Sequence, residues 1–539
     1  MNLATRFLAV AVLVGAAWWV VASTTRPARM LAPLPGKGDV HLGDEGPACP
    51  IRKAFGMKDP PVVRGKSLYA LHCAACHGSE GNGRGPAAVF IHPKPRDFTS
   101  GQFKVRSTAS GTPTDEDLYG VITQGTPGSS MPGFWFLKER DRRDLVAYVK
   151  HLSAKEEEGR RVNHFAENPA GSSIAVPAVP EFIPALAAKG AQVYAALDCA
   201  NCHGPKGLGD GPQSVGMKDA WGGHLKPRGF ARDRFIGGDA PEAIYLRIAA
   251  GIGGTPMNAY PDSRVSPEDR WALVAHVLSL RQAAKGPGLG QTDDGVGIAA
   301  ARCGGALPAS PGDAAWKSVS QHAVMINPIW RRREPTRYVG VRALHDGKRV
   351  AMLLEWVSGD AADAAVLRVQ DFGDAAAVQF SLTERPGFIG MGDPFHPVNL
   401  WQWRAAHPSG EAREQIAGVY PTKKPDIYPD AGNLYLSAAM AGNPLAMDLE
   451  SPVQESNAYG FGTLVIQRPG EQDVAGGGDW AGGHWRAIFI RDMAPRSHRD
   501  VDLAPGRRVP VAFAVWDGRN GDRNGQKNVS AWHVLELEK

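Results

Sequence analysis

Residues 71–90 read LHCAACHGSEGNGRGPAAVF, which places two cysteines and a histidine in one tight turn ahead of a glycine-rich stretch. A second copy follows at residues 197–212, with the sequence LDCANCHGPKGLGDGP. The likeness continues along the chain, where HPKPRDF pairs with HLKPRGF, GSSMPGF with GGTPMNAY, and LVAYVKHLS with LVAHVLSL, in the same order. This internal repeat indicates duplication of one functional module.

The CxxCH pattern in each copy has a specific chemical use. Two thiols at this spacing add to the vinyl groups of haem, and the adjacent histidine then lies under the iron, so each motif predicts one covalent haem c. A thioredoxin-like pair or half of a zinc site is disfavoured, because no βαβ pattern surrounds the motif and no second CxxC completes the zinc ligands. The residues concerned are Cys73, Cys76 and His77, and Cys199, Cys202 and His203.

A methionine in each copy is placed to fill the sixth position of the iron. Met131 in SSMPGF and Met257 in TPMNAY both follow the haem motif and precede the last expected helix of their copy. Thioether ligation raises the reduction potential relative to a second histidine, which suits an electron carrier. The alternative is that either methionine fills a gap in a small core. Their matching positions favour ligation.

Each copy resembles a class I cytochrome c domain, with a helix running into CxxCH, a glycine-rich loop, a methionine loop and a final helix. The resemblance implies two all-α domains, at residues 61–153 and 187–282. It also implies that a proline carbonyl orients the proximal histidine and that a nearby arginine meets a haem propionate; a solvated loop charge is the alternative for each arginine. The candidates are Pro86 with Arg96 in the first copy, and Pro212 with Arg228 in the second.

After about residue 313 the sequence consists of short runs rich in Val, Ile, Phe and Trp, such as RVAMLLEWV, WRAIFI and VPVAFAVW. Gly, Pro, Asn and Asp separate these runs, a pattern typical of an antiparallel β-sandwich with long loops. The expected fold class is therefore multidomain, with two all-α domains followed by an all-β sandwich at residues 313–539. No cysteine follows Cys303, so a cofactor in the sandwich would be held without thioether bonds.

Over most of residues 316–537 this region resembles the haem-b-binding subunit of the ethylbenzene dehydrogenase type. The resemblance rests on GFIGMGDPFHPVNLWQWRAA, GFGTLVIQ, HWRAIFIRDM and VPVAFAVWDGRNGDRNGQKNVSAWHVLEL. Related subunits serve dimethylsulfide dehydrogenase, chlorate and selenate reductases and some periplasmic nitrate reductases. The family implies one non-covalent haem b between Met391 and Lys527, which without it would be a loop residue and a surface lysine. The rival ligands are His322, His396 and His533.

The N-terminus carries an uncharged apolar run, residues 7–22, after Arg6. It predicts an export segment within residues 1–30, either a cleaved signal peptide or an uncleaved membrane anchor. Both outcomes predict a protein outside the cytoplasm, periplasmic, secreted or anchored to the cytoplasmic membrane. Residues 154–186 and 283–312 mix Pro, Gly and polar residues and are expected to be linkers.

The 539 residues suffice for three or so domains. A net charge of +5 from 60 basic and 55 acidic residues shows no stripe or patch suited to nucleic acid. Four of the six cysteines belong to the CxxCH motifs. The remaining two, Cys49 and Cys303, are expected either to form a disulfide or to be free thiols.

No nucleophile, catalytic dyad or glycine-rich cofactor loop is recognisable in the chain. The resemblances therefore imply an electron-transfer subunit, whose haem b faces the iron-sulfur and molybdopterin subunits of an oxidoreductase of the nitrate/nitrite, oxyanion, sulfide or hydrocarbon type. The haems c would connect it to soluble or membrane cytochromes. One alternative is a redox enzyme in its own right, such as a dihaem peroxidase or a thiosulfate-oxidising cytochrome, which needs an open or unusual haem. Another is a sensor whose sandwich binds a small ligand.

Overall fold

The structure is a computed structural model, and it describes residues 59–231, 233–281, 297–330, 332, 336–358, 372–405, 422 and 451–539. The expected export segment within residues 1–30 lies outside the described residues, and so does Cys49, the expected disulfide partner of Cys303. Within the described ranges, no helix has the length and apolar character needed to cross a bilayer.

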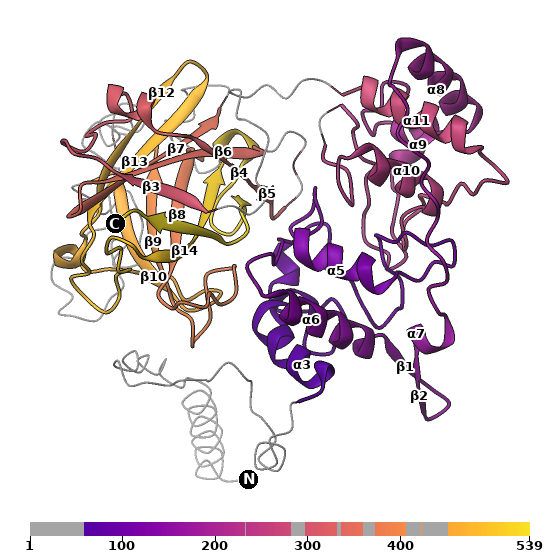
Figure 1. The fold of residues 1–539 in the computed structure, drawn as a ribbon, viewed down its shortest axis with the longest axis horizontal. Helices are drawn as coiled ribbons and strands as arrows, with labels where there is room; N and C mark the ends of the chain where they lie inside the picture. Colours follow the sequence, from indigo (N-terminus) through magenta and orange to yellow (C-terminus); the bar gives the residue numbers. More distant parts are fainter. Residues whose placement is uncertain are drawn as a thin grey trace, which may run out of the picture. The chain divides into compact units, whose positions relative to one another are not determined.

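The first cytochrome unit is a small helical domain held together by the crossing of its first and last long helices (Figure 1). At this crossing a β-carbon on Gly65 would lie 2.1 Å from the carbonyl oxygen of Asp144, so glycine permits the close approach. Arg64 pairs with Asp144 beside it at 2.6 Å. The elements are α3 (Pro61–His72), α4 (Ala74–His77), η1 (Ala88–Phe90), α5 (Asp115–Gln124) and α6 (Glu139–Leu152).

The second cytochrome unit repeats this arrangement. A β-carbon on Gly190 would lie 1.9 Å from the carbonyl oxygen of Ala272, which matches the crossing of the first unit. The hydroxyl of Tyr194 donates to the carbonyl oxygen of Gly204 at 2.8 Å, as Tyr69 does to Gly78 in the first unit. The elements are α8 (Pro184–Ala196), α9 (Ala200–His203), η2 (Pro212–Ser214), α10 (Pro241–Ala250) and α11 (Pro267–Ser279).

Part of the first expected linker is folded. It forms a hairpin of β1 (Ala154–Glu157) and β2 (Arg160–Asn163), followed by the short helix α7 (His164–Glu167). The Phe165 ring lies 5.6 Å from the Phe103 ring of the first unit, so apolar burial holds this segment against that domain.

The C-terminal region is one large β-sheet in which β3 (Ile298–Arg302) lies between β16 (His533–Leu537) and β6 (Tyr338–His345) and runs parallel to both. The sheet therefore begins inside the second expected linker, and it departs from the purely antiparallel expectation at these two pairings. Alternating burial explains the insertion, because Ile298 and Ala300 face the core at 1% and 0% exposure.

The other strands pair antiparallel, in the order β11-β10-β9-β8-β14-β16 on one side of β3 and β6-β7-β13-β12 on the other. Their bounds are β4 (His322–Met325), β5 (Asn327–Pro328), β6 (Tyr338–His345), β7 (Arg349–Val357), β8 (Ala375–Ser381), β9 (Val398–Arg404), β10 (Val453–Ala458), β11 (Val465–Ile466), β12 (Ala475–Ala481), β13 (His484–Asp492), β14 (Arg508–Trp516), β15 (Asn528–Val529) and β16 (His533–Leu537).

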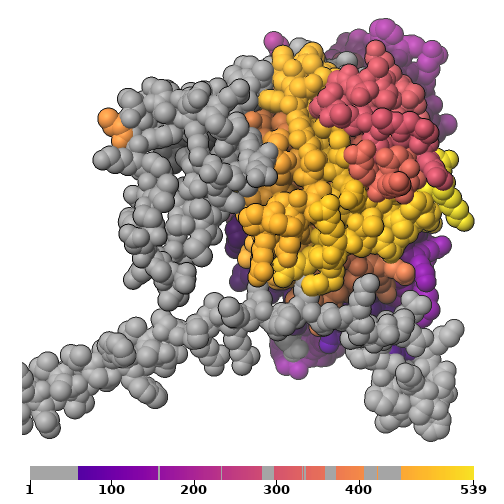
Figure 2. Space-filling model, turned by 90° about the vertical axis from the view of Figure 1, so that its left-hand side faces the viewer, coloured from indigo at the N-terminus to yellow at the C-terminus, as the bar shows by residue number. Residues whose placement is uncertain are grey.

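The sheet folds over itself, so that two faces share one core. Trp401 on β9 lies 6.5 Å from Phe489 on β13, and Trp403 on β9 lies 5.9 Å from Trp356 on β7. These partners belong to opposite halves of the strand order, which gives the two layers expected of a sandwich. Figure 2 shows the residues after 451, in orange and yellow, forming a continuous surface on one face.

Candidate functional site

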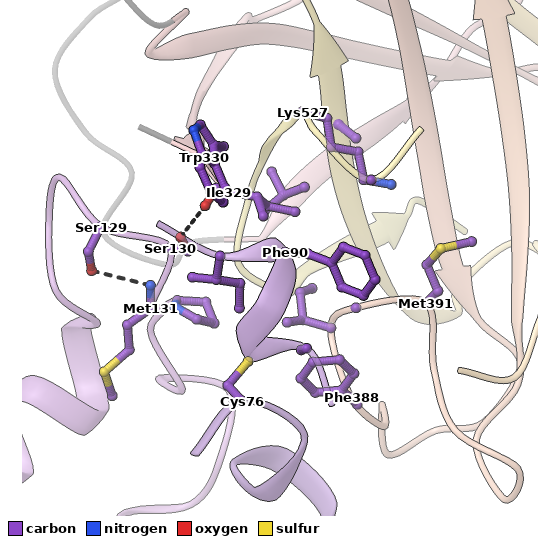
Figure 3. A pocket seen from close by; sticks show the side chains of 18 of the residues that line it. Cys76, Phe90, Ser129, Ser130, Met131, Ile329, Trp330, Phe388, Met391 and Lys527 are labelled. Carbon is purple, nitrogen blue, oxygen red and sulfur yellow. Dashed lines mark hydrogen bonds between the residues drawn. The ribbon is translucent and has the colours of Figure 1, made fainter. Parts of the chain in front are cut away.

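A cavity of about 1770 Å³ joins the haem motif of the first cytochrome unit to the sandwich (Figure 3). A site for one small molecule occupies about 300–1,000 Å³, so this space exceeds what a single such ligand needs. It brings together residues that the sequence assigns to two different cofactors. They are Cys73, Cys76, His77 and Met131 from the first unit, and Met391 and Lys527 from the sandwich.

The histidine of the first motif is buried and held in one orientation. His77 ends the single turn α4, and its ring stacks on Phe98 with centroids 4.5 Å apart. Nδ1 donates to the carbonyl oxygen of Arg96 at 2.8 Å, which leaves Nε2 as the nitrogen able to bind a metal. Burial lowers the pKa of His77 to about 4, so the ring is neutral at physiological pH, as ligation requires.

The carbonyl that meets His77 belongs to Arg96, which corrects the role inferred for Pro86. The glycine-rich turn carries the later segment across the motif, because the Phe98 amide donates to the carbonyl oxygen of Gly81 at 2.7 Å. This contact places the neighbouring Arg96 carbonyl beside the ring. Pro86 lies in the cavity wall instead.

The second unit shows the same correction for Pro212. His203 Nδ1 donates to the carbonyl oxygen of Arg228 at 3.2 Å, and its ring stacks on Phe230 at 4.4 Å. The Phe230 amide in turn donates to the carbonyl oxygen of Gly207 at 2.5 Å. Both arginines therefore have a backbone role that the sequence did not reveal.

The Arg96 side chain suits a propionate partner. Its Nε and Nη1 atoms are buried and have no hydrogen-bond partner among the described residues, and its guanidinium lies 3.9 Å from the ring centroid of Trp221 in the second unit. Burial lowers its pKa to about 10, although Asp219 and Asp97 oppose the shift. The Arg228 side chain differs, because its Nη2 donates to the carbonyl oxygen of Gly128 in the first unit at 2.6 Å.

The two predicted methionine ligands lie in equivalent loops. The Met131 carbonyl accepts from the Thr126 amide at 3.1 Å, and the Met257 carbonyl accepts from the Ile252 amide at 3.0 Å. The Thr126 hydroxyl also lies 3.6 Å from the Met131 sulfur. Met131 lines the same cavity as His77. This geometry supports ligation, which stays a prediction.

Met391 lies in a tight loop with unusual backbone geometry. Its φ of +76° is in the left-handed region that side chains rarely adopt, and such strain collects at functional sites. The Gly460 amide donates to the Met391 carbonyl at 2.8 Å, and the Gly392 amide donates to the Phe388 carbonyl at 2.9 Å. The loop is therefore fixed from two sides, with Met391 in the cavity wall.

Lys527 is the other predicted sandwich ligand, and it lies partly buried in the cavity wall. Burial lowers its pKa from 10.5 to about 8, which favours the neutral amine that can bind iron. Its Nζ atom lies 4.8 Å from the ring centroid of Trp516. Burial is the only cause of this shift, and among the described residues no aspartate or glutamate contributes to it.

The three rival histidines are placed elsewhere. His396 Nδ1 lies 3.0 Å from the Asp393 carboxylate, and the Ala299 amide donates to His322 Nε2 at 3.4 Å. His533 is buried, with its ring 5.4 Å from that of Trp135. None of the three is among the described residues that line the cavity.

Sequence reasoning missed His72, which immediately precedes the first CxxCH motif. It is 3% exposed, lines the cavity, and neither ring nitrogen has a hydrogen-bond partner among the described residues. Burial lowers its pKa to about 3. A comparison of the two copies could have pointed to His72, because the second copy has Asp198 at the corresponding position. Unpartnered nitrogens of His72 and Arg96 fit a cofactor that carries acceptor oxygens.

Comparison with protein families matches these regions separately. Residues 313–528 match the family described as ethylbenzene dehydrogenase, and residues 62–153 and 187–281 match the family described as cytochrome c.

Three curated relatives resemble parts of the chain. A protein named as a respiratory nitrate reductase heme subunit in Haloferax mediterranei is 29% identical over 36% of this chain and 53% of its own length. The gamma subunit of dimethylsulfide dehydrogenase from Rhodovulum sulfidophilum is 27% identical over 41% of this chain and 72% of its own. The gamma subunit of chlorate reductase from Ideonella dechloratans is 25% identical over 42% and 80%. The chain thus spans only about half of the Haloferax protein.

Among solved structures, a chain of the reducing HAO-like protein complex from Kuenenia stuttgartiensis is 36% identical. It covers 42% of this chain and 100% of that one, with a TM-score of 0.39. The family matches and the motif geometry lead to one conclusion. This chain contains two cytochrome c domains, which imply haem c, followed by a domain of the ethylbenzene dehydrogenase gamma type.

Proposed function

We propose that the chain is an electron-transfer protein with two covalent haems c and one non-covalent haem b. The observation that carries this proposal is the single cavity that the CxxCH motif of the first unit shares with Met391 and Lys527. Haem, when bound, supplies one-electron exchange. The chain has to hold each haem, orient its ligands and restrict water.

In the first unit we assign these tasks to residues of the haem motif and of the methionine loop. Cys73 and Cys76 would form the thioether bonds, and His77 is already neutral and oriented by the Arg96 carbonyl. Met131 would be the second protein ligand of this haem, so the iron would exchange electrons without binding a substrate. The second unit has the same set of two cysteines, one histidine and one methionine, namely Cys199, Cys202, His203 and Met257.

In the sandwich, Met391 and Lys527 would hold haem b. Both line the cavity, Met391 from a strained loop and Lys527 with a lowered pKa. With two protein ligands for each haem, as proposed here, the chain would be an electron carrier and not a redox enzyme, because an enzyme acting at haem iron needs an open position.

The curated relatives support a place in a larger complex. They are named as heme or gamma subunits of a nitrate reductase, dimethylsulfide dehydrogenase and chlorate reductase. We infer that this chain serves an oxidoreductase in the same way, with iron-sulfur and molybdopterin subunits on one side and soluble or membrane cytochromes on the other. The apolar run at residues 7–22 supports a periplasmic location.

Pyridine haemochrome spectra before and after acid-acetone extraction test the cofactor content. We expect two haems that stay with the polypeptide and one that is extracted. Replacing both Cys199 and Cys202 with serine should remove one covalent haem and leave the extractable one. A fully matured preparation without extractable haem would contradict the haem b assignment, and intact covalent haem in the serine variant would contradict the haem c assignment.

A further inference from the structure

We propose that the first cytochrome unit forms one wall of the haem b site, closed by Phe90, so that this unit and not the second is the redox neighbour of the sandwich. The inference rests on the proposed function and adds the order of the cofactor sites. It comes from contacts between the first unit and both loops that carry the predicted haem b ligands.

The loop of Lys527 contacts the first unit through Ile329. The Ile329 amide donates to the Lys527 carbonyl at 2.9 Å, and the Ile329 carbonyl accepts from the Ser130 hydroxyl at 2.8 Å. Ser130 directly precedes Met131, the predicted ligand of the first haem c (Figure 3). The His92 amide also donates to the Ile329 carbonyl, at 3.0 Å. One residue therefore connects the ligand loops of two cofactor sites.

The loop of Met391 contacts the first unit through aromatic side chains. The Phe90 ring stacks on the Phe461 ring with centroids 6.2 Å apart and an angle of 20° between their planes. Phe461 lies 5.6 Å from Phe388 and follows Gly460, whose amide binds the Met391 carbonyl. All three rings line the cavity, and Figure 3 shows Phe90 extending toward Met391.

Phe90 has the exposure expected of a cofactor wall. It is 54% exposed although it is a large apolar side chain in the cavity, so an apolar macrocycle bound there would cover it. His72 adds a polar group of the first unit to the same cavity. The charges that act on His72 belong to Arg385, His396 and Asp393 of the sandwich, which places the ring at this junction.

The second unit lacks these features. Counting from the CxxCH histidines, the positions of Val89 and Phe90 correspond to Val215 and Gly216. Val215 is 85% exposed, and nothing lies within 4 Å of a β-carbon built on Gly216. Among the described residues, none from 154–281 lines the cavity. The second unit does meet the sandwich, through the Arg234 side chain and the Met325 sulfur on β4, but neither residue lines the cavity.

Transfer of haem from the full-length holoprotein to apomyoglobin tests the wall directly, because only a non-covalent haem can leave. Phe90→Ala should raise the rate of haem b loss about tenfold, equivalent to about 1.4 kcal/mol of lost contact. Phe461→Ala, which removes the stacking partner, should have a similar effect. Val215→Ala, at the position in the second unit that corresponds to Val89, is the control and should leave the rate unchanged. Covalent haem content and the far-ultraviolet dichroism spectrum report whether each variant is folded.

A Phe90→Ala variant that is folded and loses haem b at the wild-type rate would overturn the proposal. Equal acceleration by Val215→Ala would overturn it as well, since the effect would then not belong to the first unit. Both outcomes differ from failure of the proposed function, in which the wild-type protein itself releases no haem. A redox titration gives a second readout. Extraction of haem b should shift the midpoint potential of the haem c that responds to Met131→His, and not that of the one that responds to Met257→His.

Discussion

Lys527 should lose its proton well below the pH at which an ordinary lysine does. Burial lowers its pKa from 10.5 to about 8. At 1.36 kcal/mol per pKa unit, forming the neutral amine then costs about 3 kcal/mol less than in an exposed lysine. At pH 7 roughly one Lys527 side chain in ten is neutral, against fewer than about one in a thousand for a lysine with the ordinary pKa. A lowered pKa of this kind is what ligation of iron by Lys527 would require.

The same shift predicts how stability depends on pH when haem b has been extracted. Between pH 8 and 10.5 the unfolded chain binds this proton more tightly than the folded chain, so the free energy of unfolding rises with pH in that window. Below pH 8 the buried ammonium destabilises the fold by about 3 kcal/mol. Lys527→Met removes the buried ammonium. The variant should therefore have a higher free energy of unfolding than wild type at pH 7 and lose that advantage above pH 10.5.

Competitive acetylation across a pH series, quantified by peptide mass spectrometry, measures the titration without unfolding the protein. Lys348, an exposed lysine between β6 and β7, supplies the reference curve. In protein freed of haem b, Lys527 should reach half-maximal reactivity near pH 8. With haem b bound, it should resist labelling while Lys348 still reacts. A Lys527 curve that coincides with the Lys348 curve in both preparations would refute the reasoning.

Four further outcomes are expected. Met131→His and Met257→His should each lower the potential of a different haem c and remove its sulfur-ligation band, as measured by spectroelectrochemistry; wild-type potentials in both would rule out ligation. Arg96→Gln should lower the potential of the first haem c by about 60 mV, because a cation that disfavours the oxidised iron is lost; an unchanged potential would place the guanidinium away from the haem. Gly190→Ala should destabilise the second unit by about 3 kcal/mol in thermal unfolding, since its β-carbon would meet the Ala272 carbonyl oxygen at 1.9 Å; an unchanged melting temperature would contradict that crossing. Lys527→Ala should weaken haem b retention and change its spectrum, and a wild-type spectrum would show that Lys527 is not a ligand.

Local chemistry explains why the haem motifs could be predicted from sequence. Cys73, Cys76 and His77 lie within five residues, so their spacing alone decides whether they can attach a haem and ligate its iron. Duplication of the motif and the change to short apolar runs after residue 313 likewise predicted two helical units and a β-rich domain. The family matches agree with that division.

Contacts between distant residues could not be predicted in this way. The carbonyl that orients His77 belongs to Arg96, because a glycine turn brings that later segment across the motif. The strand β3 was expected to be linker, since a five-residue run is too short to show that it pairs with β6 and β16. The carbonyl partner of His77 and the pairing of β3 both depend on which distant parts of the chain meet after folding.

The cavity that joins the first unit to the sandwich shows most clearly the difference between what neighbouring residues predict and what distant contacts add. The thioether cysteines and the proximal histidine of each haem c could be predicted from sequence, because that prediction depends on side chains a few positions apart. The contact between the first unit and the sandwich exists only in the folded chain, where Phe90 stacks on Phe461 and Ile329 lies between Ser130 and Lys527. These partners lie hundreds of residues apart, and their packing depends on shape and backbone hydrogen bonds that no local pattern encodes.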